Sequence, residues 1–150
     1  MAKELKEIQI ELTNTMIQHY VESVGLAFED TYNDKKQCWC WKRGTADIEV
    51  FVQSVEIGKT KTREYLRIFS HVADVPKISK QGREDFLLKL LQANDRSLGV
   101  KLTVMGETNK VYATYERDIS GMDYQELSTC ISDLEWWADK FDDELKSHNN

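Results

Sequence analysis

Residues 38–42 read CWCWK, so that two cysteines and two tryptophans alternate along the chain. Thiols at this spacing could hold a metal ion or form a disulfide. A metal site would need further ligands such as Cys130 or His71, yet no C-x-x-C pair or paired histidines occur. A disulfide between Cys38 and Cys40 would be strained, because alternate strand residues lie near the upper limit of Cα spacing for disulfides. We therefore expect structural thiols, no metal and no cofactor.

Motifs that accompany catalysis are incomplete in this chain. Gly58-Lys59-Thr60 matches the end of a phosphate-binding loop, but Gln53 stands where that loop needs glycine, and a strand should follow instead of a helix. There is no G-x-S-x-G motif, and no histidine lies in a local motif that would activate a nucleophile. The acidic residues between 139 and 144 are typical of a solvated helix face. We predict that the protein is not an enzyme.

Composition restricts the class of protein further. The chain has 150 residues, of which 41% are hydrophobic and 31% charged, a mixture that predicts one globular domain over residues 1–150. We expect residues 1–2 and 147–150 to be flexible. The net charge of −6 disfavours nucleic-acid binding. The N-terminus has neither a signal sequence nor a membrane span, and three cysteines make no disulfide framework, so we expect a cytoplasmic protein without membrane contact.

Three segments have the apolar periodicity of amphipathic helices. Gly25 should end the first, because glycine adopts a left-handed cap without steric penalty. Asp123 and Glu126 form a capping box at the start of the third. The predicted ranges are 3–24, 79–94 and 123–146. The apolar stripe of the first helix comprises Leu5, Ile8, Leu12, Met16, Ile17, Tyr20, Val21 and Val24, and that of the second comprises Phe86, Leu87, Leu90 and Leu91.

Five shorter segments have the properties of β-strands, and two of them show clear alternation of apolar and polar residues. The predicted strands are 37–43, 46–55, 64–72, 100–105 and 111–117. A wide turn at 56–63 and a short one at 106–110 make hairpins. The order α-β-β-β-α-β-β-α predicts an α+β fold with an antiparallel sheet, because strands occur in runs that helices separate. The two long helices, the first and third, should pack on one face of the sheet.

The opposite face of this sheet would carry aromatic side chains, and aromatic residues on an open face indicate a binding surface. A tryptophan on the third helix also points away from the apolar stripe, and tryptophan is enriched at binding hot spots. The two tryptophans of CWCWK share one strand face, so that they either seal the core or face a partner. The candidate partner-binding residues are Trp39, Trp41, Phe51, Tyr65, Phe69 and Trp136.

From about residue 45 to residue 145 the sequence resembles the YbjN family of the type III secretion chaperone-like superfamily. The segments that carry the resemblance are YLRIFSHVADVP (65–76), LLKLLQANDRS (87–97), VKLTV with VYATYERDISGMDYQEL (100–127) and WADKFDDEL (137–145). The predicted order of elements is the one this superfamily uses. The resemblance implies a small, acidic, cytoplasmic and non-enzymatic protein, usually a homodimer, that binds an extended segment of a partner polypeptide along hydrophobic surface.

We interpret the chain as a chaperone-like or regulatory binding protein. If the aromatic residues of the sheet were packed beneath the protein's own helices, no aromatic binding surface would exist and this hypothesis would be contradicted. The alternative is a small-molecule sensor or enzyme whose site is a pocket between the sheet and the helices. A sizeable closed cavity with convergent polar groups would favour the alternative.

Overall fold

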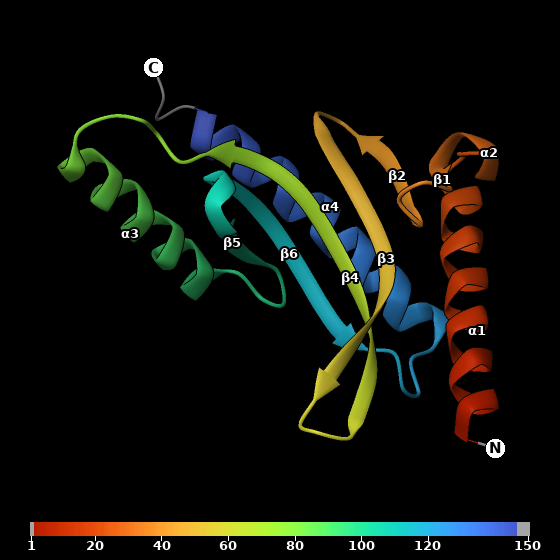
Figure 1. The fold of residues 1–150 in the computed structure, drawn as a ribbon. Coiled ribbons are helices and arrows are strands. Elements are labelled where there is room, and N and C mark those ends of the chain that lie inside the picture. The colour runs from red at the N-terminus through yellow and green to blue at the C-terminus, as the bar shows by residue number, and fades with distance from the viewer. Residues whose placement is uncertain (1, 147–150) are drawn as a thin grey trace.

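The computed structural model describes residues 2–146, which form a six-stranded antiparallel sheet with helices on one face (Figure 1). The expected flexibility of Met1 and of residues 147–150 falls outside the described residues. The helices are α1 (Ala2–Ser23), α2 (Phe28–Thr31), α3 (Lys80–Arg96) and α4 (Tyr124–Lys146). The strands are β1 (Tyr32–Asn33), β2 (Cys38–Arg43), β3 (Ala46–Ile57), β4 (Lys61–Asp74), β5 (Lys101–Met105) and β6 (Lys110–Asp118), and a 3-10 turn, η1 (Gly106–Thr108), joins the last two.

The order of strands in the sheet is β1-β2-β3-β4-β6-β5, and every neighbouring pair is antiparallel. The predicted α+β fold and order of elements are confirmed. The short α2 and β1 are additions that the sequence did not predict. They precede the turn after Asn33, whose side-chain oxygen accepts from the amides of Lys35 and Lys36 at 3.1 Å. This side-chain turn brings β1 back alongside β2.

Two helix ends form as their residues predict. Gly25 has a φ of +86°, and the amides of Gly25 and Leu26 donate to backbone carbonyls of the last turn of α1 at 3.0 and 3.1 Å. This paired arrangement is the Schellman cap of a helix. At the start of α4 the Asp123 amide donates to the Glu126 carboxylate at 2.9 Å, and the Glu126 amide donates back to Asp123 at 2.8 Å.

The hairpin between β3 and β4 is longer and tighter than predicted. Ile57 pairs with Lys61, so that only residues 58–60 form the turn, and the prediction of a wide turn over 56–63 is wrong. Gly58 has a φ of +75°, a conformation that lets the chain reverse within a few residues. The charged residues of this region therefore continue the strands instead of forming a loop.

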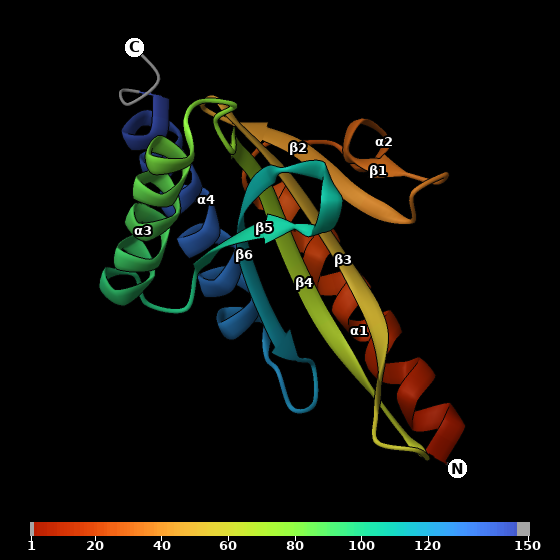
Figure 2. The ribbon, with the colours of Figure 1, turned by 60° about the vertical axis from the view of Figure 1, so that its left-hand side comes forward.

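The core lies between the sheet and the helices. Ile48, Val50, Leu66 and Ile68 alternate along β3 and β4 toward the helices, and each is 0% exposed. They are packed in one cluster with buried residues of α4, including Ile131. In Figures 1 and 2, α1 and α4 lie on the same side of the sheet, while α3 lies at its β5 end. The predicted placement of the two long helices on one face is confirmed.

Helix α3 buries less of its apolar stripe than predicted. Phe86 and Leu90 are buried, but Leu87 and Leu91 are 39% and 66% exposed. The helix meets the sheet only at its β5 edge, so that one narrow line of side chains is covered. It also continues beyond Asn94 to Arg96, which corrects the predicted end.

The side chain of Asn94 has a different role from the helix stop predicted. Its amide nitrogen donates to the Leu102 carbonyl at 3.1 Å, and its oxygen accepts from the Leu102 amide at 2.6 Å. Asn94 thereby satisfies both backbone groups of a residue at the outer edge of β5. This pair fixes α3 to the sheet at a point where no further strand follows.

We predict that Asn94→Ala lowers the free energy of unfolding by about 1 to 3 kcal/mol, because it leaves the part-buried Leu102 amide and carbonyl without partners. Gln92→Ala on the exposed side of the same helix is the matched control and should change it by less than about 0.5 kcal/mol. Denaturant unfolding of the purified variants measures both values. Equal effects of the two substitutions would contradict the role assigned to Asn94.

Candidate partner-binding surfaces

The two tryptophans of CWCWK belong to the core. Trp39 and Trp41 are 5% and 6% exposed, and they pair in register with Val50 and Ile48, whose side chains face the helices. The ring of Tyr20 on α1 lies 6.1 Å from that of Trp41. Their assignment as partner-binding residues is therefore wrong, because the register of β2 turns both indoles inward, beneath α1 and α4.

A buried carboxylate holds α1, β2 and α4 together. Glu135 of α4 is 4% exposed and accepts a hydrogen bond from the Tyr20 hydroxyl. The Trp41 indole also donates to it at 3.4 Å, and the Arg43 guanidinium lies 3.5 Å away. Burial raises the pKa of Tyr20, and the hydrogen bond to Glu135 raises it further. The sequence interpretation missed Glu135, although its position four residues after Ile131 places it beside the apolar stripe of α4.

The aromatic residues predicted on the open side of the sheet lie there. Phe51 and Phe69 stack with ring centroids 5.7 Å apart on the face away from the helices, and the ring of Tyr112 meets Phe69 edge-on at 6.1 Å. The guanidinium of Arg67 lies 4.6 Å above the Phe69 ring. Phe69 is consequently only 6% exposed, although no helix covers it. It supports this face more than it contributes surface.

Phe51 and Tyr65 retain part of their surface in the same region. Arg67 between them is engaged on two sides, since it donates to Glu116 at 2.6 Å and to Gln53 at 2.6 Å. A shallow hollow of about 390 Å³ lies over these side chains. The open face is therefore a nearly flat surface of aromatic rings crossed by paired charges.

Trp136 lies on a different side of the molecule. It is 58% exposed on α4, beside a groove of about 420 Å³ that Tyr20 and Arg43 also line. The Lys140 ammonium lies 5.1 Å from its ring. Because α4 packs on the helix-covered side of the sheet, the structure does not bring Trp136 together with Phe51.

The first half of α1 exposes apolar side chains that were predicted to be buried. Ile17 and Val21 in the second half are fully buried, but Leu5, Ile8 and Leu12 are 64%, 49% and 57% exposed. We call these three residues the α1 stripe. Figure 2 shows this half of the helix running alongside the β3–β4 hairpin toward its tip. Both polar and apolar residues of this half of α1, among them Lys6 and Leu5, border the hairpin.

Lys6 makes the contact between α1 and the hairpin. Its ammonium lies 2.8 Å from the Glu64 carboxylate, which is 6% exposed, and it donates to the Thr62 hydroxyl at 3.1 Å. A groove of about 740 Å³ runs between the two elements, with Leu5 and Ile8 on its helix side. The ion pair holds this half of α1 alongside the hairpin, and the α1 stripe stays largely exposed at the groove and beyond it.

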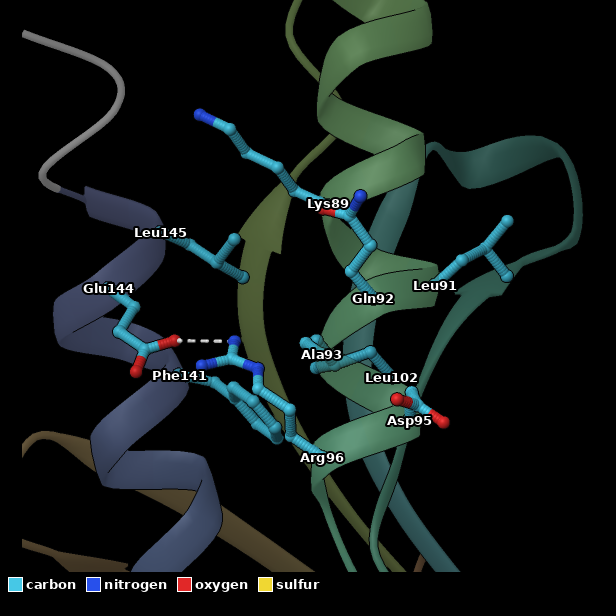
Figure 3. A pocket seen from close by; sticks show the side chains of 10 residues that line it. All are labelled: Lys89, Leu91, Gln92, Ala93, Asp95, Arg96, Leu102, Phe141, Glu144 and Leu145. Atoms are coloured by element: carbon cyan, nitrogen blue, oxygen red, sulfur yellow. Dashed lines mark ion pairs between the residues drawn. The ribbon is translucent and has the colours of Figure 1, made fainter.

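Helix α3 forms a second apolar surface. Leu87, Leu88 and Leu91 are exposed along it, and Val104 and Met105 are exposed on the neighbouring edge strand β5. A groove of about 720 Å³ lies between α3 and α4, and Figure 3 shows the side chains that line it. Leu145 and Phe141 of α4 face the groove from one side, and an ion pair of 3.7 Å between Arg96 and Glu144 crosses it.

Within residues 2–146, no three or more His, Cys, Asp or Glu side chains are grouped to hold a metal ion. The same range contains no helix with the length and apolar character to span a bilayer. Fully buried side chains such as Ile68, Ile131 and Leu134 fill the space between sheet and α4, where the sensor or enzyme hypothesis would need a cavity.

We predict that Tyr20→Phe lowers the free energy of unfolding by about 1 to 2 kcal/mol near neutral pH, because buried Glu135 loses a donor. The raised pKa of Tyr20 means that this contribution is complete below about pH 10, the pKa of tyrosine in the unfolded chain, and is lost as pH rises above it. Denaturant unfolding is measured near neutral pH and again above about pH 10. The difference in unfolding free energy between wild type and variant should be smaller at the alkaline pH. Tyr65→Phe on the open face is the control, and an equal loss there would contradict the prediction.

Comparison with known proteins identifies the fold. No protein-family model matches the sequence, and no curated protein is recognisably similar to it. The structure is similar to the HopA1–SchA chaperone–effector complex, with a TM-score of 0.60 and 13% identity over 87% of this chain and 93% of that chain. It is similar to the ExsC–ExsE complex, with a TM-score of 0.61 and 12% identity over 89% and 92%.

A third solved structure is the type III secretion chaperone SycH of Yersinia pestis in complex with a stable fragment of YscM2. Its TM-score is 0.52 at 11% identity, over 85% of this chain and 97% of that chain. These identities are too low to transfer residues or partners, but the coverage includes most of both chains. The protein therefore has the α+β fold of the type III secretion chaperones.

Proposed function

We propose that this protein is a non-catalytic, cytoplasmic, chaperone-like module that holds a segment of a partner polypeptide on apolar surface that its own fold leaves uncovered. The observation that carries the proposal is the α1 stripe, in which Leu5, Ile8 and Leu12 face solvent along one side of a helix. Contiguous apolar side chains on an exposed helix mark interaction sites. Sequence resemblance to the YbjN family and the chaperone fold both support this role.

The size of the α1 stripe limits what it can do alone. Burial of an aliphatic side chain contributes about 1.5 to 3 kcal/mol, so that completing the burial of three half-exposed ones contributes roughly 2 to 4 kcal/mol. Association itself costs on the order of 4 to 15 kcal/mol. A partner must therefore extend from the α1 stripe over further surface. An extended segment can do so, which agrees with fragments and effectors being the ligands in the structures similar in fold.

Charge around the α1 stripe indicates the chemistry of the partner. Glu4, Glu7 and Glu11 are exposed on the same half of the helix, and the whole chain carries a net charge of −6. A segment with apolar residues interspersed with lysine or arginine would complement this surface. We propose Phe51, Tyr65 and the underlying Phe69 as a second contact area on the open face, and Trp136 as a separate one on the helix side.

We predict that replacing the α1 stripe by serine (Leu5→Ser, Ile8→Ser and Leu12→Ser together) weakens binding of the partner at least tenfold without unfolding the protein. The exposed residues contribute little to the core, so that the variant should retain its unfolding midpoint. Leu98→Ser, at a residue 81% exposed between α3 and β5, is the control. The partner is identified by co-purification with wild type from source cells and then re-tested with purified components by calorimetry.

Binding of the purified partner should persist in Leu98→Ser and fall at least tenfold in the stripe variant. Equal affinity of both variants would exclude the α1 stripe as the binding surface. Failure of wild type to retain any polypeptide at stoichiometric amounts would count against the proposed function as a whole.

We further propose a homodimer, formed through α3 and the β5 edge. Three exposed leucines on one helix, next to a strand at the edge of the sheet, form an apolar surface that a two-fold axis can pair with itself. The surface lies at the opposite end of the sheet order from β2, away from the α1 stripe. Dimer formation and partner binding would therefore not compete.

We predict that Leu91→Glu converts the dimer into a monomer, because dimerisation would bury an unpaired charge in an apolar interface. Gln92→Glu places the same charge on the neighbouring, more polar position and should leave the dimer intact. Light scattering coupled to size exclusion at micromolar concentration measures the mass of each variant. A wild-type mass equal to one chain of 17.5 kDa would contradict the proposed dimer.

A further inference from the structure

The two thiols of β2 lie together on the open face of the sheet. The Sγ atoms of Cys38 and Cys40 are 3.2 Å apart. Cys38 is 4% exposed, and Cys40 retains part of its surface. Trp39 between them points into the core, and Cys40 pairs in register with Glu49 of β3. A buried indole and a paired strand therefore fix the backbone from which both sulfur atoms project.

This geometry disfavours a disulfide but suits an atom bound between the two sulfurs. A disulfide needs an S–S distance of about 2.05 Å and a Cα spacing no greater than about 6.8 Å. Alternate residues of an extended strand are already about 6.6 to 6.8 Å apart, so that closure would distort a strand held in the sheet. An ion between two sulfurs needs them farther apart than they lie here. Rotation of the Cys40 side chain, which is partly exposed, would supply that separation.

The number of available ligands selects the kind of ion. Zinc sites in proteins use at least three protein ligands, usually four. Among residues 2–146, no group of three or more His, Cys, Asp or Glu side chains is placed to hold a metal. Soft thiolate ligands select Cu(I), an ion that two sulfur atoms can satisfy. A two-coordinate ion does not need the further ligands, such as Cys130 or His71, that a zinc site would require.

We propose that Cys38 and Cys40 form a two-thiolate binding site for Cu(I). No electron transfer is involved: Cu(I) forms two Cu–S bonds, and the two thiol protons pass to solvent. Cys40 lines an open hollow of about 670 Å³ on the sheet face, which gives the ion access, while burial of Cys38 excludes water from the inner sulfur. Lys36 and Glu49 line the same hollow and form an ion pair at 3.9 Å.

The site is independent of the proposed partner binding, because it involves neither the α1 stripe nor α3.

The test is anaerobic titration of the reduced full-length protein with Cu(I), in competition with the Cu(I) chelator bicinchoninate. Wild type should retain one copper ion per chain, with sulfur-to-copper charge-transfer absorption in the near ultraviolet. Cys130→Ser, at a buried thiol of α4, is the matched control and should retain copper equally. Cys40→Ser should weaken retention at least tenfold, and Cys38→Ser should do the same.

Cys38 is buried and its variant could lose the fold, so far-ultraviolet circular dichroism is recorded for each protein. The partly exposed Cys40 supplies the decisive variant. Equal retention by wild type and Cys40→Ser, or loss of copper in Cys130→Ser, would overturn the proposal. Stoichiometric binding of Zn²⁺ in an equivalent competition titration would overturn the two-ligand geometry. Binding of Cu(I) together with loss of partner binding only in the stripe variant would keep the two proposals distinct.

Discussion

The fold depends on covering one face of a strongly amphipathic sheet. Side chains such as Ile48, Val50, Leu66 and Ile68 alternate onto the same face of two long strands and are completely excluded from water. At about 1.5 to 3 kcal/mol for each such side chain, exposure of these four alone would cost about as much as the net stability of an ordinary domain. Helix α4, with the strongest capping signal and a matching apolar stripe, supplies the cover. The positions of α1 and α3 follow from the area that α4 leaves.

Polar groups then orient the elements that apolar packing leaves free to rotate. Glu135 on α4 accepts from α1 and β2 at once, and Lys6 on α1 pairs with buried Glu64 on the hairpin. Such buried charges add little net stability, but the loss of one partner would leave the other without compensation. Their effect is directional. The pairing of Lys6 holds the first half of α1 beside the hairpin, where Leu5 and Leu12 stay more than half exposed.

The exposed apolar surfaces of α1 and α3 therefore result from how each helix packs on the rest of the protein. A helix whose apolar stripe is wider than its docking site exposes the excess, as α3 does with Leu87 and Leu91. A helix held by an ion pair instead of by apolar packing keeps its apolar side chains exposed, as the first half of α1 does. The open face of the sheet has no comparable apolar surface among the described residues, because the paired charges of Arg67 and Glu116 cover much of its aromatic area. Apolar surface suited to partners thus lies mainly on the helices.

Local periodicity and capping chemistry by themselves determined the order of elements, the ends of α1 and α4, and the alternation of the sheet. These properties depend on residues a few positions apart, such as Gly25 or the pair Asp123 and Glu126, and such patterns are visible in a sequence. The facing of Trp39 and Trp41, the buried role of Glu135 and the exposure of the α1 stripe were decided only in three dimensions. Each depends on which distant element lies opposite, and register and helix rotation are not encoded in any single segment.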